Sequence, residues 1–279
     1  MIRKFWLTNG TMTGGVLNEW HFTDESFKCF LHNPQGLGFS KSLSLVRYGN
    51  KQNITDSSDN FPSVQGELMF YDDENSGRYE KYNDFVRFVS YSPLVFHYQL
   101  PYLDALDNDI IYTLDCDAVS LQKTETKTDG VLTCPVTFTG LSFWKAAKVT
   151  TTGSTTSYTL ANNGDFPVGF EITVKGSLTN PYVTLEQNSE LYGEAKFVDS
   201  TAFDEVYIDS VDGEQNVILK QSGSALPNPL SYQDLSISNG SIYVTFVKLA
   251  RGQSVLTIGY DSGSITSVNI SFTPIYRSV

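Results

Sequence analysis

The sequence has little charge and no basic cluster. Charged residues make up 18% of its 279 residues, and the net charge is −12 at pH 7. This charged fraction lies below the quarter or so that is usual in soluble domains. The few Lys and Arg residues are scattered over both halves, so the phosphate backbone of a nucleic acid would be repelled rather than bound. We therefore expect no specific nucleic-acid binding.

Long apolar segments and cysteines are also scarce. No apolar run reaches the ~18 residues of a membrane-spanning helix, and the opening Met1–Trp6 is charged and aromatic, unlike a signal peptide. The three cysteines, Cys29, Cys116 and Cys134, are too few and odd in number for a disulfide framework. We expect buried thiols in a protein made in a reducing cytoplasm, with no membrane association.

Residues that usually carry catalysis or bind metals are sparse as well. The only histidines are His21, His32 and His97, and none forms a metal-site pattern with another ligand type. The sequence contains no Cys-x-x-Cys, no G-x-S-x-G elbow and no Walker loop. We predict no catalytic residue, no metal site and no cofactor. His97, between two aromatic residues of a predicted strand, is interpreted as structural.

Three weaker candidates are also interpreted as structural. Gly36-Leu37-Gly38 resembles the start of a dinucleotide-binding loop, but it lacks the third glycine and follows Asn33-Pro34, which favours a turn. Asp72-Asp73-Glu74 lacks the alternating spacing of a calcium loop, and it precedes a predicted helix whose dipole it can stabilise. Asp209 and Asp212 could form a glycosidase pair, but acids are common at strand ends and nothing supports a general acid here.

Aromatic residues are abundant. They make up 13% of the chain, with 18 Phe and 16 Tyr, and all hydrophobic residues together make up 40%. This is enough apolar surface to build a core. Aromatic and β-branched side chains fit a pleated, half-buried surface, so the composition predicts a mostly β protein.

One segment predicts an amphipathic helix of about three turns. Its apolar residues recur at the spacing of a single helical face, with candidate caps before it and Pro93 beyond its end. The apolar positions are Tyr79, Tyr82, Phe85, Val86 and Val89, and the candidate caps are Asn75 and Ser76.

Most of the remaining sequence predicts short strands separated by Gly, Pro and Asp. In the first half they are Val64–Tyr71, Leu94–Tyr98, Ile110–Cys116, Ala118–Thr126 and Val131–Thr139, with a tight hairpin turn predicted at Asp129-Gly130. In the second half they are Val168–Lys175, Tyr182–Glu186, Glu205–Ser210, Asn216–Gln221, Ser241–Val247, Ser254–Tyr260 and Thr266–Phe272.

The small polar segment VTTTGSTTS at residues 149–157 predicts a domain boundary. We expect a first domain at residues 1–148, barrel-like or sandwich-like with one helix and a hairpin. The second domain, residues 149–279, has short strands at regular spacing, which predicts a β-sandwich or jelly roll. Exposed aromatics on such a sandwich can stack on sugars, although core filling explains most of them. The candidates are Tyr182, Tyr192, Tyr232 and Tyr243.

Short motifs from about Asn33 to Phe272 resemble the distal tail protein (Dit) family of long-tailed phages. Each motif is weak alone, and their order and spacing carry the resemblance. In the first half they are Asn33–Phe39, Gly66–Phe70 followed by Tyr79, Tyr82, Phe85 and Pro93-Leu94, and Leu121–Glu125 with Leu132–Phe138 ahead of Trp144. In the second half they are Gly176, Asn180-Pro181, Leu185, Val206–Ser210, Leu249 and Gly252. The first 25 residues match no motif.

The resemblance implies a virion protein of the phage tail tip, with neither catalysis nor a cofactor. Its N-terminal domain would form a homohexameric ring that continues the tail tube, and its C-terminal domain would be a galectin-like β-sandwich. The ring would be a hub for the tail tube protein, the tail-associated or tail-tip protein, and receptor-binding or baseplate proteins. The net charge of −12 would let DNA pass through the lumen without binding.

Two other readings stay open. A carbohydrate-binding β-sandwich module for host recognition would be monomeric and would respond to sugar. An enzyme is the third reading, and the sparse, unclustered histidines weigh against it.

Overall fold

The chain folds into two compact units. The computed structural model describes residues 3–48, 51–72, 77–104, 108–123, 127–128, 131–198, 202–225, 236–237, 240–244, 246 and 248–279. The first unit contains residues 1–147 together with 276–279, and the second contains residues 148–275. The last four residues of the chain therefore belong to the first unit.

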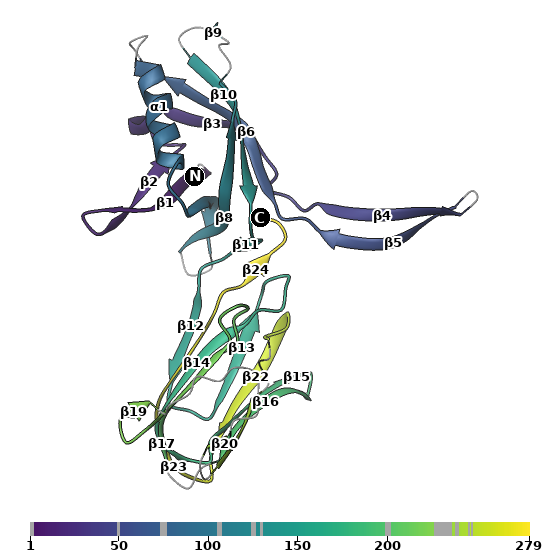
Figure 1. Ribbon diagram of the computed structural model, residues 1–279, viewed down its shortest axis with the longest axis vertical. Coiled ribbons are helices and arrows are strands. Elements are labelled where there is room, and N and C mark those ends of the chain that lie inside the picture. The colour runs from purple at the N-terminus through teal and green to yellow at the C-terminus, as the bar shows by residue number, and fades with distance from the viewer. Residues whose placement is uncertain are drawn as a thin grey trace. The chain divides into compact units, whose positions relative to one another are not determined.

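The first unit consists of a ten-stranded sheet, a separate two-stranded hairpin and the helix α1 (Gly77–Val89) (Figure 1). The main path of the sheet runs β2-β1-β7-β8-β10-β6-β3. Its strands are β1 (Lys4–Thr13), β2 (Val16–His21), β3 (Cys29–Gln35), β6 (Ser63–Tyr71), β7 (Leu94–Leu103), β8 (Asp109–Leu121) and β10 (Val131–Gly140), joined by the two-residue strands β9 (Lys127–Thr128), β11 (Trp144–Lys145) and β24 (Ile275–Tyr276). The hairpin is β4 (Lys41–Tyr48) with β5 (Lys51–Asp59), and a 3-10 turn, η1, spans Glu25–Phe27.

The ten-stranded sheet curls around α1. Phe85 of the helix lies 5.3 Å from Trp20 on β2 and 5.9 Å from Phe70 on β6, measured between ring centroids. These two strands stand near opposite ends of the strand order, so both ends of the sheet bend toward one helix. The sheet is not a closed barrel, because in the described residues the edge strands β2 and β3 do not pair.

The predicted helix is confirmed. It spans 13 residues and buries Phe85 completely, while Tyr79, Tyr82 and Val89 pack against the same core. Val86 departs from the prediction, because it lies on the solvent side with 36% of its surface exposed. The candidate caps Asn75 and Ser76 lie outside the described residues.

Two strands predicted separately form one continuous strand. The segments Ile110–Cys116 and Ala118–Thr126 were separated at acidic residues, yet β8 continues from Asp109 to Leu121. Within it, Asp115 forms an ion pair with Lys145 on the neighbouring β11, so an acidic side chain does not interrupt the strand. The strands β8 and β10 are antiparallel neighbours, and the predicted turn Asp129-Gly130 between them lies outside the described residues.

The second unit is a β-sandwich, as the strand spacing predicted. Two six-stranded sheets enclose one hydrophobic core, in the orders β12-β23-β14-β17-β18-β19 and β13-β22-β15-β16-β21-β20. The rings of Phe197 and Phe203, from different sheets, lie 6.4 Å apart. The strands are β12 (Val149–Gly153), β13 (Ser157–Asn162), β14 (Phe170–Thr179), β15 (Tyr182–Gln187), β16 (Glu190–Val198), β17 (Phe203–Asp209), β18 (Asn216–Gln221), β19 (Ser224–Ala225), β20 (Ser236–Ile237), β21 (Gly240–Val244), β22 (Gly252–Gly259) and β23 (Ser262–Phe272).

The polar segment expected at the domain boundary is itself structured. Its first five residues form β12, which pairs with β23 at the edge of one sheet. All five are at least partly exposed, which explains their small, polar composition. The polar run therefore marks an edge strand, while the division between the compact units falls just before it.

Gly36 fixes the point at which the β4–β5 hairpin leaves the sheet. Its φ is +84°, and a Cβ at this position would lie 1.8 Å from the carbonyl oxygen of Ser63. The same root is held by the C-terminal residues, because Arg277 Nε donates to Asp59 at 2.7 Å and the Val279 N–H donates to the Leu37 carbonyl at 3.1 Å. The glycine is a structural requirement of this turn, as the sequence predicted.

We expect Gly36→Ala to lower the free energy of unfolding of the first unit by about 1–3 kcal/mol, through the strained φ and the clash with Ser63. The matched control is Gly38→Ala, because a Cβ there meets open space. It should change stability by less than about 0.5 kcal/mol. All three tryptophans lie in the first unit, so their fluorescence during urea unfolding reports on it. Equal effects of the two substitutions would contradict the argument.

Candidate assembly surfaces

The histidines and cysteines form no catalytic or metal-binding cluster. His21 lies 2.8 Å from Glu19, and His32 lies 3.7 Å from Glu67. In the described part of the chain, no group of three His, Cys, Asp or Glu side chains could hold a metal ion. All three cysteines are buried, and burial raises the pKa of Cys29 to about 12. Buried thiols with such a pKa are poor nucleophiles at neutral pH.

His97 on β7 is a packed side chain. Its ring stacks on Trp6 at 4.8 Å between centroids, and its Nε2 lies 3.1 Å from the Thr8 hydroxyl. Burial lowers the pKa of His97 to about 4, whereas an unfolded histidine titrates near 6.5. The unfolded chain therefore binds a proton more readily than the folded one between these pH values.

This difference in proton binding predicts that the folded protein loses stability in acid. The stability contributed by neutral His97 is fully present above pH ~6.5 and is lost as the pH falls toward 4. We expect the melting temperature of the wild type to fall more steeply across this window than that of His97→Gln, which carries no titrating group. His32→Gln, at an exposed position, is the control and should keep the wild-type slope. Parallel curves for wild type and His97→Gln would contradict the prediction.

The acidic residues singled out from the sequence have structural partners. Asp209 is buried and accepts hydrogen bonds from the Val211 N–H at 2.9 Å and the Tyr207 hydroxyl at 3.2 Å. Asp212 pairs with Lys248 at 2.7 Å. Asp72 accepts from Lys28 Nζ at 3.0 Å, while Asp73 and Glu74 lie outside the described residues. Asp209 and Asp212, which were considered as a glycosidase pair, therefore each bind different local partners.

The tyrosines proposed for sugar stacking do not form one platform. Tyr182 is half-buried and lies across Gly259, where an added Cβ would fall 1.9 Å from its ring. Tyr192 is 54% exposed, but it lies toward the opposite end of the β15–β16 pair. Tyr232 and the side chain of Tyr243 lie outside the described residues.

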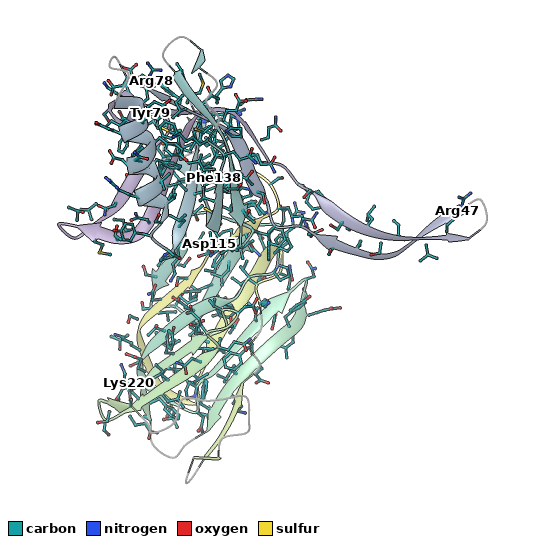
Figure 2. All side chains as sticks on the ribbon, turned by 45° about the horizontal axis from the view of Figure 1, so that its top comes forward. Arg47, Arg78, Tyr79, Asp115, Phe138 and Lys220 are labelled. Atoms are coloured by element: carbon teal, nitrogen blue, oxygen red, sulfur yellow. The ribbon has the colours of Figure 1, made fainter. Side chains whose placement is uncertain are left out.

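The β4–β5 hairpin, residues 41–59, is an exposed arm. Its two strands pair only with each other in the described structure, and Figure 2 shows Arg47 far along it from the core around Phe138. Leu43 is 50% exposed and Ile54 is 62% exposed. An isolated two-stranded hairpin is marginally stable in water, so cover by another surface would stabilise the arm.

Sequence reasoning did not identify the arm. The available signal is the alternation Ser-Leu-Ser-Leu-Val at residues 42–46, which is typical of a half-buried strand. The arm, residues 41–59, contains three Lys or Arg and two Asp, a net charge of +1 in a chain whose net charge is −12. The arm thus differs in charge from the rest of the molecule.

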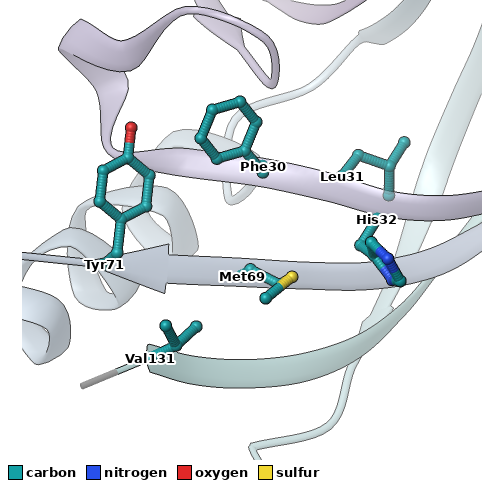
Figure 3. Close-up of a pocket in the computed structure, with 6 residues that line it drawn as sticks. All are labelled: Phe30, Leu31, His32, Met69, Tyr71 and Val131. Atoms are coloured by element: carbon teal, nitrogen blue, oxygen red, sulfur yellow. The ribbon is translucent and has the colours of Figure 1, made fainter. Parts of the chain in front are cut away.

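A second apolar surface lies at the outer face of the sheet edge (Figure 3). It is a pocket of about 410 Å³ formed by β3, β6 and β10. We call it the edge pocket; its lining residues are Phe30, Leu31, His32, Met69, Tyr71 and Val131. Its apolar lining at an open sheet edge is typical of a protein-binding surface.

A third exposed apolar surface is the turn between β1 and β2. Met12, Val16 and Leu17 are exposed around Gly14-Gly15, and no charged residue occurs from Phe5 to Asn18. With the arm and the edge pocket, the first unit presents three apolar surfaces and no candidate catalytic centre in its described residues. Such a distribution is typical of a subunit of a larger assembly.

The comparison with known families agrees with this reading. The sequence profile "Distal tail protein, N-terminal domain" matches residues 4–141. Residues 4–141 are the N-terminal domain of a distal tail protein. The family resemblance inferred from the motifs is thereby confirmed, and it places the chain in the tail of a phage virion. Among curated proteins, none is significantly similar to the chain.

Solved structures extend the likeness to the second unit of this distal tail protein. The crystal structure of SPP1 Dit (gp 19.1), described as a paradigm of hub adsorption apparatus in phages that infect Gram-positive bacteria, superposes with a TM-score of 0.63. It is 12% identical, and the alignment covers 98% of this chain and 99% of that one. Chains of the phage P2 baseplate in its activated conformation, with Ca or with Sr, give TM-scores of 0.53 and 0.54 at 13% identity over both full lengths. At such identities the likeness establishes a shared fold. No helix among the described residues is long and apolar enough to cross a membrane.

Proposed function

We propose that this distal tail protein is a non-enzymatic hub at the end of the phage tail tube, where six copies form a closed ring. The tail tube protein would bind one side of the ring, and tail-associated, tail-tip or receptor-binding proteins would bind the other. The family of residues 4–141 supports a structural role in the tail. No cofactor, metal or catalytic residue takes part in this function.

The exposed arm is the observation that carries the ring. It offers apolar side chains that its own unit does not cover. An arm that binds a different surface on the next copy makes a heterologous contact, and a chain of such contacts closes into a ring when the rotation allows. The net charge of −12 also supports a lumen that DNA crosses without binding. A lumen lined by Lys and Arg would contradict that part of the proposal.

The test is the native mass of the purified chain, measured by mass spectrometry or light scattering over a wide concentration range, alone and with neighbouring tail proteins. The expected result is six times the 31.0 kDa chain mass, formed alone or with a partner. A mass that stays at one chain under every condition would contradict the ring.

A carbohydrate-binding module is the second candidate. The exposed side chains of Leu191 and Tyr192 on β16 favour it, because an exposed tyrosine can stack on a sugar ring. This function predicts a monomer whose tyrosine fluorescence changes on titration with host cell-wall sugars, and loss of that change in Tyr192→Ala. A protein that reaches six-fold mass and shows no fluorescence change with sugar would support the hub and contradict the carbohydrate-binding module.

A further inference from the structure

We infer that the segment Tyr276–Val279 is a clasp that fixes the direction in which the arm leaves the sheet, with Arg277 as the positioning residue. The clasp is carried by its contacts with the base of both arm strands, by the freedom of one connection of the arm, and by the order of the segments along the chain. Its consequence for assembly rests on the proposed ring, whereas the clasp itself can be tested without the ring.

Two short connections join the arm to the sheet. The first, residues 36–40, follows β3, and the second, residues 60–62, precedes β6. The second connection is held by neighbouring residues, because the Pro62 carbonyl accepts a hydrogen bond from the Gly140 N–H at 3.0 Å and the ring of Phe61 lies edge-on to Phe143 at 4.9 Å. The first unit therefore fixes this connection without the clasp.

The first connection has more freedom. Its Leu37 packs against the core, but Gly38 follows, and a Cβ at this position would meet no atom within 4 Å. Glycine gives the backbone a wide choice of conformations. In the part of the chain that the structure describes, residues 38–40 hydrogen-bond only with Asn60 of the other connection. Bonds between the two connections can move with the arm, so a swivel is available at Gly38.

The clasp is anchored in the first unit on both sides of Arg277. Before it, the ring of Tyr276 lies edge-on to Tyr112 at 5.4 Å between centroids. After it, Val279 packs against the same core, and its N–H donates to the Leu37 carbonyl at 3.1 Å. This hydrogen bond holds the chain at the residue just before the swivel. The backbone that carries Arg277 is thus fixed to the body of the first unit.

Arg277 contacts the base of both arm strands. Its Nε donates to the carboxylate of Asp59, the last residue of β5, at 2.7 Å. Its guanidinium lies 6.0 Å from the centre of the Phe39 ring, two residues before β4 begins. Only 20% of the Asp59 side chain is exposed, so this ion pair is less screened by water than a fully exposed one. A rotation at Gly38 would move the two strand bases away from this one side chain.

The clasp follows the second unit without a spacer. Ile275 still belongs to that unit, where its carbonyl accepts a hydrogen bond from the Asp165 N–H at 2.7 Å. Tyr276 is the next residue and already packs in the first unit. The clasp is therefore translated only after the whole second unit. The arm takes its fixed direction only in a chain whose second unit has been made.

A fixed direction favours a closed ring. Every contact in such a ring repeats the same rotation, so the arms of all copies must leave the sheet at one angle. A free arm loses its range of directions on binding, whereas a clasped arm has lost it beforehand. The loss recurs at each contact of the ring. We expect Arg277→Gln to raise the concentration at which half of the protein is at the ring mass by about tenfold or more.

The first measurement is the direction of the arm itself. Cysteines introduced at Val46 on the arm and at Glu80 on α1 carry spin labels, since both positions are exposed and the native thiols are buried. Below the concentration of assembly, their spacing reports on single chains. The wild type should give a narrow distribution of distances. Arg277→Gln, and independently Val279→Pro, which lacks the N–H donated to Leu37, should each give a broad one.

Two comparisons isolate the clasp. Lys248→Gln removes an ion pair of the same length in the second unit, with Asp212, and should keep the narrow distribution and the wild-type mass. Asp59→Arg combined with Arg277→Asp restores opposite charges at the arm root and should narrow the distribution relative to Arg277→Asp alone. Tryptophan fluorescence during urea unfolding shows that each variant is folded.

The outcomes separate the clasp from the ring. Folded Arg277→Gln and Val279→Pro variants that both keep the narrow distribution would overturn the clasp, whether or not the ring forms. A broad distribution with wild-type assembly would overturn the need for a fixed arm direction in the ring. A wild type that never assembles, with a distribution that still broadens in Arg277→Gln, would overturn the proposed ring and support the clasp.

Discussion

Removing the arm is expected to leave a folded chain that no longer assembles. In this variant a short Gly-Ser linker replaces residues 42–58, so that Lys41 and Asp59 remain and the ion pair of Asp59 with Arg277 is kept. Native mass should fall from six chains to one at every concentration at which the wild type forms its ring. The unfolding midpoint should hardly change, because no described side chain of the arm belongs to either hydrophobic core.

A loss of the six-chain mass with an unchanged unfolding midpoint would show that the arm serves assembly and not the stability of the fold. Ser58→Ala changes an exposed polar residue of the arm and serves as the control, with both wild-type mass and wild-type midpoint expected. An arm-less chain that still reaches six-fold mass would show that another surface closes the ring, and the exposed β1–β2 turn around Met12 and Val16 would then be the next surface to alter.

Features that depend on burial were predictable from the sequence, as the helix illustrates. Tyr79, Tyr82 and Phe85 repeat at helical spacing because one face of α1 packs into the core. The strands of the sandwich were predictable for the same reason, since buried residues such as Ile172 and Val174 alternate with less buried ones such as Thr173. In both cases the local pattern reflects which face meets apolar neighbours.

Features that depend on exposure or on distant contacts were not predictable. The side chains of the arm that the structure describes are exposed, except for the partly buried Asp59, so their burial pattern does not distinguish a strand from a loop. Gly14-Gly15 lies between two apolar runs and is a hairpin signal for β1 and β2, but no strand was predicted from it. The return of Tyr276–Val279 to the first unit depends on partners such as Leu37 and Asp59, more than two hundred residues earlier. Such pairings leave no local pattern in a single sequence.

The largest stability effect is expected at Phe85. Its side chain is fully buried and touches rings from β2 and β6, together with Phe22 at 6.0 Å. Phe85→Ala removes the ring and leaves a cavity between the helix and the curled sheet, and such changes cost about 3–5 kcal/mol. Urea unfolding followed by tryptophan fluorescence measures this loss in the first unit. Val86→Ala, one position along the same helix and exposed, is the matched control and should change stability by less than about 0.5 kcal/mol.

A graded substitution links this packing to assembly. Phe85→Leu keeps part of the side-chain volume, so its cost should lie between those of Val86→Ala and Phe85→Ala. The arm root and the edge pocket are both built on β3 and β6, and Phe85 contacts β6 directly through Phe70. The sheet should pack less tightly around α1 as stability falls from Val86→Ala to Phe85→Leu to Phe85→Ala. The fraction of protein at the six-chain mass should therefore fall in the same order. A Phe85→Ala variant that loses less than about 1 kcal/mol would contradict the conclusion that Phe85 is central to the packing of the sheet around the helix.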